Sequence, residues 1–308
     1  MPQKNVLIVS NTDDAHATAI HDRLRKRSIQ TYRLDSDTFT RGEHSWRIHS
    51  DTNRDSFSSW SIPDVDVVWY RKVKFPEPTD VVQSFISKEN QGLFDCILAG
   101  YDDCRWVNPL DRLAKARSKI VQLRKAINIG LRIPDTIITT SVEALREFSM
   151  RHNGEVVAKP IQAQVIGSAD AALVVGTRKL MPEYFESATK FSPCYAQERL
   201  PLKSEIRVVV FGDQLFSFKL TAKEKADDLK QLKLSQIYHE WCELDESISR
   251  KIRLLMSLYG LEFGAIDLAV VDDDEPIFLE LNPNGQWLWL QYATGVNLAD
   301  PFIDFLCF

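Results

Sequence analysis

Residues 263–285 read FGAIDLAVVDDDEPIFLELNPNG, and this stretch decides the fold. Two apolar, β-prone runs at 261–271 and 276–281 flank a charged segment whose composition is typical of a turn. A hairpin centred between residues 273 and 274 places Asp267 directly opposite Glu280. Asn282 follows Glu280 by two positions and therefore points to the same face. Two carboxylates and an amide oxygen on one face predict a Mg²⁺ site, because Mg²⁺ prefers oxygen ligands; the alternative is a plain surface hairpin with a charged face.

The same pairing makes a prediction about stability. Like charges that face each other across a sheet repel. We therefore expect that neutralising either Asp267 or Glu280 leaves the stability of the ligand-free protein unchanged or raises it.

The composition excludes several classes of protein. The chain has 308 residues, 44% of them hydrophobic and 26% charged, which suits a globular protein of two or three subdomains. A net charge of −5 does not provide the basic surface that nucleic-acid binding needs. No apolar run approaches the roughly 20 residues of a membrane span, and the first one is too short for a signal peptide. Five scattered cysteines without a CxxC motif indicate free thiols, so we expect a cytoplasmic protein without nucleic-acid or membrane partners.

The first hundred residues predict alternating strands and helices that resemble the start of a nucleotide-binding domain in shape. The predicted elements are a strand at 5–10, a helix capped at 11–14 and running to about Lys26, strands at 30–34 and 66–70, and a helix at 89–100. No GxGxxG motif is present, so no dinucleotide is assigned. Arg71 begins a basic loop after the strand at 66–70. Loops at the carboxyl ends of strands line ligand crevices, so Arg71 could bind a carboxylate or phosphate; the alternative is a solvated basic loop.

A lysine inside an apolar strand is the most informative feature of the middle of the chain. The strand at 156–160 reads VVAKP and carries Lys159. An unpaired charge is costly to bury, and a phosphate group would offset that cost; alternatively, the side chain reaches the edge of the sheet. One continuous helix, predicted at 112–127, contains Lys119. The segment 162–168, which has a single glycine, is a candidate flap over phosphates.

A second charged strand lies in the C-terminal part. The strand at 206–211 enters a tight turn, and its alternation places Glu205 and Arg207 on one face. An inward Arg207 could neutralise phosphate charge through two hydrogen bonds, or it could form a structural pair with one of the acids. The segment 221–233 is predicted to be a surface segment without chemistry. The six histidines show no ligand spacing, so we expect them to be exposed or structural.

Three parts of the sequence resemble the ATP-grasp ligases, and together the resemblance covers nearly the whole chain. They are FGAIDLAV followed by IFLELNPNGQW, then VVAKP, and QERLPLKSEIRVVVFGD at 197–213. The resemblance implies a site for ATP and two Mg²⁺ ions. By position, it implies the metal ligands Asp267, Glu280 and Asn282, the phosphate-binding Lys119 and Lys159, the adenine hinge Glu198, Arg199 and Leu200, the ribose-binding Glu205, and the catalytic Arg207 facing the γ-phosphate and acyl phosphate.

The resemblance also implies a mixed α/β fold in three parts. They are an N-terminal α/β pre-ATP-grasp domain at 1–112, a central ATP-grasp subdomain at 113–194, and a C-terminal subdomain at 195–308 that holds an antiparallel sheet and the metal site.

Three further stretches are similar to one branch of these ligases, the macrocyclases of microviridin-type ribosomal peptides (graspetides). They are YRLDSDTF at 32–39, VVWYRK at 67–72 and VVGTRKL at 174–180. Such enzymes join a peptide Asp or Glu side chain to a Ser or Thr hydroxyl or a Lys amine. The resemblance therefore implies a precursor peptide with leader and core segments as partner, and leaves open whether the enzyme is a homodimer. Many members carry Asp-Trp-Arg after the arginine strand, where this chain has Asp228-Leu229-Lys230, so substrate detail stays open.

Two alternatives remain at this point. The first is a ligase that acts on a smaller acid, such as a RimK-like glutamate adder or a dipeptide ligase. The second is a non-catalytic ATP-binding regulator with the same fold, against which the intact set of Arg207, Asp267, Glu280 and Asn282 argues.

Overall fold

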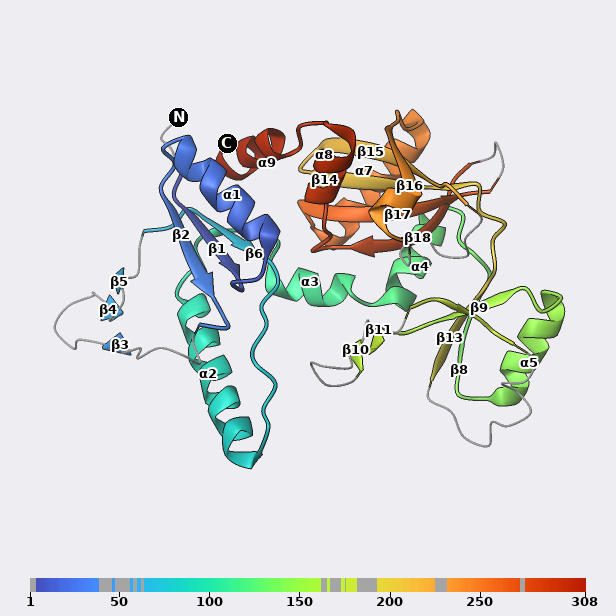
Figure 1. The fold of residues 1–308 in the computed structure, drawn as a ribbon, viewed down its shortest axis with the longest axis horizontal. Coiled ribbons are helices and arrows are strands. Elements are labelled where there is room, and N and C mark those ends of the chain that lie inside the picture. Colours follow the sequence, from blue (N-terminus) through green and yellow to red (C-terminus); the bar gives the residue numbers. More distant parts are fainter. Residues whose placement is uncertain are drawn as a thin grey trace.

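The computed structural model describes residues 4–38, 64–161, 176–181, 193–224, 232–271 and 275–308 (Figure 1). Of five further short strands it describes the backbone alone: β3 (Trp46–Arg47), β4 (Ser56–Phe57), β5 (Trp60–Ser61), β10 (Val165–Ile166) and β11 (Leu173–Val174). Three predicted features lie outside these residues: the flap at 162–168 apart from β10, the hairpin tip at 272–274, and Asp228-Leu229-Lys230.

The N-terminal part contains a parallel sheet with the strand order β2-β1-β6-β7. Its strands are β1 (Val6–Ser10), β2 (Thr31–Asp35), β6 (Val67–Tyr70) and β7 (Arg105–Val107). Every residue of β1 is buried, as expected for a strand that is covered on both faces. Alternate side chains enter different cores: Ile8 shares one with α1 (Ala15–Lys26), whereas Leu7 shares another with α2 (Val81–Ala99).

Two predicted helices differ from the structure. The helix expected at 89–100 already begins at Val81, because Asp80 Oδ1 caps it by accepting a hydrogen bond from Gln83 N at 2.8 Å. The single helix expected at 112–127 is instead two helices, α3 (Leu110–Ala116) and α4 (Lys119–Asn128). The Gln122 side chain compensates for the break, since its Nε2 donates to the carbonyl of Ala116 at 2.6 Å.

The central part is an antiparallel sheet with the strand order β12-β9-β13-β8. Its strands are β8 (Thr136–Thr139), β9 (Val156–Lys159), β12 (Arg178–Lys179) and β13 (Cys194–Glu198). Helix α5 (Val142–Arg151) begins after its cap residue Ser141 and packs against this sheet. Strand β13 pairs here, although residues from 195 onward were assigned to the C-terminal part; the division into three parts stays a prediction.

The C-terminal part is a five-stranded antiparallel sheet with the order β16-β15-β14-β17-β18. Its strands are β14 (Ser204–Phe211), β15 (Gln214–Ala222), β16 (Ile237–Trp241), β17 (Phe263–Val270) and β18 (Ile277–Asn282). Helices α4 and α7 (Glu246–Tyr259) cover one face, while α8 (Leu288–Thr294) and α9 (Ala299–Cys307) share a core with the other. The sequence pattern predicted neither β16 nor the helical conformation of α9.

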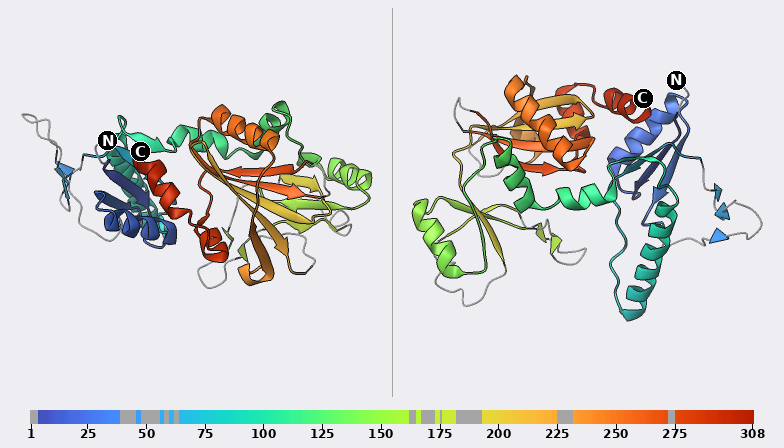
Figure 2. Two further views of the ribbon diagram at one scale, coloured as in Figure 1. Left: turned by 90° about the horizontal axis from the view of Figure 1, so that it is seen from above. Right: turned by 180° about the vertical axis from the view of Figure 1, so that it is seen from behind.

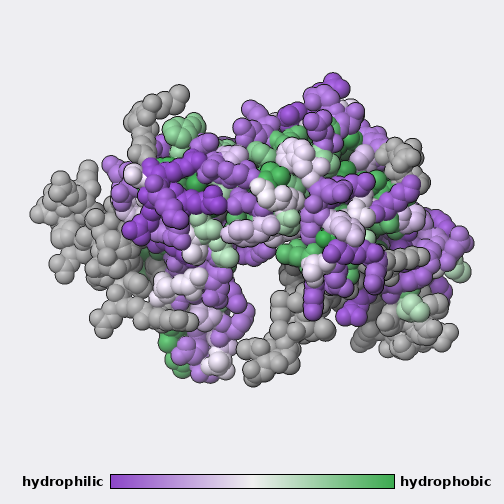
Figure 3. All heavy atoms as spheres, turned by 45° about the horizontal axis from the view of Figure 1, so that its top comes forward, coloured by the Kyte–Doolittle hydropathy of each residue, from purple (hydrophilic) through white to green (hydrophobic). Residues whose placement is uncertain are grey.

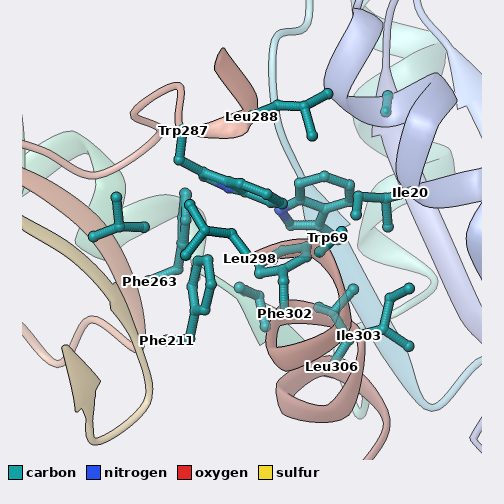
Figure 4. Packing of buried hydrophobic residues seen from close by; sticks show 14 of the residues in the cluster. Ile20, Trp69, Phe211, Phe263, Trp287, Leu288, Leu298, Phe302, Ile303 and Leu306 are labelled. Carbon is teal, nitrogen blue, oxygen red and sulfur yellow. The ribbon is translucent and has the colours of Figure 1, made fainter. Parts of the chain in front are cut away.

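The N-terminal and C-terminal sheets share one hydrophobic core. Helix α9 returns the chain to the N-terminal part, where it packs against α1 and β6 (Figures 1 and 2). In that core Trp287 and Phe302 lie between Phe211 of the C-terminal sheet and Trp69 of β6 (Figure 4). The ring centroids of Phe211 and Trp287 are 5.4 Å apart, and those of Trp69 and Phe302 are 4.7 Å apart. The segment that follows β18 is therefore fixed against the N-terminal part.

The surface of the described residues is mostly hydrophilic on the face that Figure 3 shows. Its exposed apolar side chains include Val81, Val82 and Phe85 at the beginning of α2. All five cysteines are free thiols, as predicted. None of the helices described is both long and apolar enough to cross a membrane.

Candidate active site

Three charged side chains lie in a row across neighbouring strands of the C-terminal sheet. The register pairs Arg207 of β14 with Asp267 of β17, and Asp267 with Glu280 of β18. The predicted pairing of the two carboxylates is confirmed. Arg207 Nη1 donates to Asp267 Oδ1 at 2.6 Å, and both residues are buried. After Asp267 the register shifts at a bulge, so the ladder is irregular next to the carboxylates.

The three predicted metal ligands differ in their access to solvent. Asp267 is buried, Glu280 is half-buried and Asn282 is exposed. Asn282 Oδ1 accepts a hydrogen bond from Asn284 N at 3.1 Å, which orients the amide. Two carboxylates and an amide oxygen fit Mg²⁺, which commonly takes one or two carboxylates together with substrate phosphates. Within the described ranges, no cluster of three His, Cys, Asp or Glu side chains is placed to hold a metal.

The buried Gln122 of α4 holds strand β18, the metal strand, which carries the candidate ligands Glu280 and Asn282. Gln122 Oε1 accepts from Leu281 N at 2.8 Å, and its Nε2 donates to the Leu281 carbonyl at 2.7 Å. Leu281 lies between Glu280 and Asn282, so one side chain fixes the backbone of β18 between two candidate ligands. The break between α3 and α4 is bridged by the same side chain, which links the corrected helix geometry to the site.

Lys119 lies where the central and C-terminal sheets meet. It is the first residue of α4, its Nζ donates to the Pro160 carbonyl at 2.9 Å, and its Nζ lies 5.6 Å from the centroid of the Tyr195 ring. Burial raises the pKa of Tyr195 well above its ordinary value, and the charge of Glu280 raises this pKa further. Tyr195 thus lies near Lys119 and shares a core with Phe278 and Leu281 of β18. A cation at a helix N-terminus opposes the helix dipole, so this position favours an anionic ligand.

Lys159 has a neutral protein partner in the central sheet. Its Nζ donates to Gln197 Oε1 at 2.7 Å, across the pair of strands β9 and β13. Gln197 is buried and also donates from Nε2 to Thr136 Oγ1 at 3.0 Å. The amide contact orients the ammonium group, and the assignment of Lys159 to a phosphate stays a prediction.

The predicted adenine hinge is built into the central part by its own side chains. Glu198 Oε1 accepts from Asp135 N at 2.9 Å, and Arg199 Nη1 pairs with Glu155 Oε2 at 2.6 Å. The N–H groups of Glu198 and Arg199 also donate within this part, to Asp135 and Glu155 carbonyls. These contacts hold the shape of the predicted hinge, whose assignment to a base stays a prediction.

Glu205 lies on the same face of β14 as Arg207, as the alternation predicted. It is 6% exposed and pairs in register with Ala269 and Leu220. Its assignment to a ribose stays a prediction.

Arg71 is buried, so the alternative of a solvated basic loop was wrong. Its side chain is 0% exposed and forms an ion pair with Asp14, with Nε 2.7 Å from Oδ2 and Nη2 3.2 Å from Oδ1. The guanidinium also lies 5.0 Å from the Trp69 ring centroid. Arg71 is therefore neither a solvated loop residue nor turned toward an open crevice, and this geometry does not support substrate binding by it.

Several residues that shape the site were not predicted. They are Gln122, Gln197, His16, Asn108 and Gly285. Asn108 is fully buried, and its Oδ1 accepts from Phe263 N at 3.1 Å while its Nδ2 donates to the Phe263 carbonyl at 2.8 Å. A Cβ atom on Gly285 would lie 2.3 Å from the Cβ of Ala265, so no larger residue fits there. The signal for Gln197 was available: it is polar within an apolar strand, the same feature that identified Lys159.

Comparison with solved structures decides the fold. The macrocyclase MdnC from Microcystis aeruginosa MRC, bound with precursor peptide MdnA, matches with a TM-score of 0.84 and 24% identity over 98% of each chain. A RiPP-associated ATP-grasp ligase of Chryseobacterium gregarium, in complex with ADP and a leader and core peptide, matches with a TM-score of 0.82 and 21% identity over 98% of this chain and 96% of that one. ATP-grasp ligase PsnB, complexed with minimal precursor, Mg and ADP, matches with a TM-score of 0.77 and 21% identity over the same shares. The chain has the ATP-grasp fold.

The fold predicted from the sequence is thereby confirmed, including its antiparallel C-terminal sheet. No protein-family model and no curated protein matches the sequence. In this ATP-grasp chain the charged row of β14, β17 and β18 lies on one sheet, and Lys159 lies on the other. Lys119 and Tyr195 mark the place where the two sheets approach each other.

Proposed function

We propose that this chain is an ATP-dependent carboxylate ligase that closes ester or amide macrocycles on a ribosomally made precursor peptide. The observation that carries the proposal is the row formed by Arg207, Asp267 and Glu280. One arginine faces two carboxylates, and the lysines at 119 and 159 add positive charge from the other side of the junction between the sheets. This arrangement suits a nucleotide whose phosphates are bound through Mg²⁺.

The chemistry requires positioning and charge neutralisation more than a reactive side chain. A carboxylate is a poor acyl donor, so the γ-phosphoryl group of ATP is first transferred to an Asp or Glu side chain of the peptide, which releases ADP. A Ser or Thr hydroxyl or a Lys amine then attacks the acyl phosphate, loses its proton and displaces phosphate. Holding these groups together and stabilising the developing charge supplies most of the acceleration.

Each site residue has a part in this scheme. Lys119 and Lys159 bind the phosphates, and Glu198, Arg199 and Leu200 form the hinge beside the base, with Glu205 at the ribose. Arg207 acts on the γ-phosphate and the acyl phosphate. Asp267, Glu280 and Asn282 hold Mg²⁺, with two ions in the complete site, and the metal supplies positive charge for the transferring phosphoryl group.

The similar solved structures support a peptide substrate in two parts. One was solved with precursor peptide MdnA, and another with a leader and a core peptide. In this chain the N-terminal part carries no nucleotide motif of its own, which leaves it available to a remote segment of a long substrate. Binding energy from a leader would then help to assemble the site.

Mass spectrometry tests the reaction. The candidate substrate is the product of a small open reading frame next to the gene, incubated with the enzyme, ATP and Mg²⁺. Each ring should appear as the loss of one water, and omission of ATP should abolish that loss. ATP turnover with a small amino acid and no change in the peptide would favour the small-acid ligase.

The leader requirement is tested by comparing three substrates: full-length precursor, core alone, and core with the leader as a separate chain. The core alone should react slowly. Leader in trans should rescue it in part, because separation forfeits the effective concentration that a covalent link provides. Equal rates for all three would rule out leader-dependent assembly.

A further inference from the structure

The segment that follows the metal strand is anchored by side chains from distant parts of the chain. We call residues 283–288 the metal-strand loop. The carbonyl of Gln286 accepts from Arg207 Nη2 at 3.1 Å, and the carbonyl of Pro283 accepts from Asn108 Nδ2 at 3.1 Å. The loop thus contacts the charged row directly through Arg207.

The far end of the loop is held by one histidine of the N-terminal part. His16 Nε2 accepts two hydrogen bonds, from Trp287 N at 2.9 Å and from Leu288 N at 2.8 Å. The backbone N–H of His16 donates to Asp14 Oδ1, the cap of α1, at 3.0 Å, so the main chain that carries the imidazole is held in the first turn of α1. A ring nitrogen accepts only when it carries no proton, so His16 is neutral with its proton on Nδ1.

The hydrophobic packing of Trp287 does not depend on the acceptor nitrogen of His16. The Trp287 ring is already enclosed by apolar side chains that include Trp69, Phe211 and Phe302 (Figure 4). His16 adds a polar contact inside that core, and it is 6% exposed. Without an acceptor, two buried backbone N–H groups would be left unsatisfied, and the loop would have to move to hydrate them. Such a movement would displace the Gln286 carbonyl and, with it, the contact to Arg207.

We infer that His16 is a positioning residue for the metal site. Its acceptor nitrogen fixes the metal-strand loop and, through that loop, the placement of Asn282 and Arg207. The inference rests on the proposed function, since it concerns the binding of a Mg²⁺–nucleotide complex. It gives the N-terminal part a role at the nucleotide site that its sequence, which lacks a nucleotide motif, does not reveal.

Two variants of the whole chain distinguish a role of His16 as a hydrogen-bond acceptor from a role in filling space. His16→Gln retains a side-chain oxygen near the position of Nε2, whereas His16→Leu has similar bulk and no acceptor. In the ligand-free protein, hydrogen exchange at the amides of Trp287 and Leu288 should rise by about tenfold or more in His16→Leu and by less than about threefold in His16→Gln.

Calorimetric titration with ADP gives the functional readout. With Mg²⁺ present, His16→Leu should bind ADP about tenfold more weakly than the wild type, and His16→Gln within about threefold. Without Mg²⁺, both variants should bind ADP within about twofold of the wild type, because the hinge is intact.

The outcomes that overturn the inference are distinct. A folded His16→Leu variant that exchanges and binds like the wild type would overturn it, as would a His16→Gln variant as impaired as His16→Leu. If His16→Leu does not fold, His16→Asn takes its place, since its shorter side chain withdraws the acceptor; equal behaviour of Asn and Gln would then overturn the inference. A wild type that binds no ADP with Mg²⁺ would remove the proposed function and this inference together.

Discussion

Two buried arginine–aspartate pairs in this molecule have the same composition and different surroundings. Arg71 contacts Asp14 through two nitrogens, and their side chains are 0% and 3% exposed. Arg207 contacts Asp267 through one nitrogen, and their side chains are 10% and 5% exposed. In the next strand, Glu280 faces Asp267 and adds a second carboxylate. A buried ion pair alone therefore does not mark a functional site; what distinguishes the row at Arg207 is the additional, partly accessible carboxylate beside the pair.

In the Arg71–Asp14 pair, the charge of the carboxylate is stabilised by neighbouring protein groups. Burial by itself would raise the pKa of Asp14, but the hydrogen bond and charge of Arg71, together with a hydrogen bond from Ser10, outweigh burial and hold the pKa well below its usual range. The row at Arg207 has one cation for two carboxylates. Two carboxylates on neighbouring strands are a donor set that suits a divalent cation.

The largest contrast between the two pairs is expected in ATP turnover. Asp267→Asn and Glu280→Gln should each reduce turnover on the order of 1000-fold, because each removes a charge that holds the metal and phosphates. Asp14→Asn, which keeps a capping side chain, should leave the turnover of the folded protein within about threefold. ADP release per folded molecule, with near-ultraviolet circular dichroism as the folding control, measures this. Comparable losses in Asp14→Asn and Asp267→Asn would erase the distinction.

Neutralising Asp267 and neutralising Glu280 should have different effects on the free energy of unfolding. The expectation that either can be neutralised without loss of stability needs correction for Asp267, because it pairs with buried Arg207. Asp267→Asn leaves that arginine without its charged partner and should lower the free energy of unfolding by roughly 3 kcal/mol. Glu280→Gln should not lower it, since it relieves repulsion. Urea unfolding of the ligand-free variants decides, and equal destabilisation by both would contradict the account.

A smaller effect is expected for the lysine that binds ATP in the ground state. Lys159→Ala should raise the KM for ATP about tenfold with little change in kcat, whereas Arg207→Ala should mainly lower kcat. The reason is that Lys159 binds the bound phosphate throughout, while Arg207 acts on charge that develops during transfer. Steady-state kinetics on variants shown to be folded provide the test, and the reverse pattern would exchange the two roles.

The smallest expected effect is a dependence of stability on pH at His16. Burial, the charge of Arg71 and, less strongly, that of Lys72 lower the pKa of His16 to about 3, although Asp14 acts in the opposite direction. Between the ordinary pKa near 6.5 and this value, the unfolded state binds a proton that the folded state does not, so stability falls as the pH falls. From pH 7.5 to 5.5 the wild type should lose about 1 kcal/mol more free energy of unfolding than His16→Gln. Other histidines are common to both proteins and cancel; parallel curves would contradict the low pKa.

The hairpin of β17 and β18 could be predicted because local rules determine it. Alternation of side chains and the composition of a turn together place Asp267 opposite Glu280, and both features lie within one short stretch. Arg71 could not be predicted in this way, since its partner Asp14 is 57 residues away in the sequence. No local pattern indicates that Arg71 will be buried against Asp14, the cap residue of α1.

The residues that hold the site in place contact partners that are still more distant in the sequence. Gln122 reaches Leu281 over 159 residues, and His16 reaches Trp287 over 271. The break between α3 and α4 could not be predicted for the same reason. The 112–127 segment favours helix throughout, and the Gln122 side chain that bridges the break also contacts the distant strand β18. Local sequence patterns therefore predicted the pairing of Asp267 with Glu280 and missed the distant residues that hold these strands in place.

Transfer of oxygen from the peptide to phosphate tests the central claim most directly. A precursor whose Asp and Glu side-chain carboxylates are labelled with ¹⁸O is incubated with the enzyme, ATP and Mg²⁺, and the released phosphate is analysed by mass spectrometry. Activation of a carboxylate as an acyl phosphate predicts one ¹⁸O atom in phosphate for each ring closed, and no label in phosphate with Glu280→Gln. Ring closure that leaves the phosphate unlabelled would contradict the account.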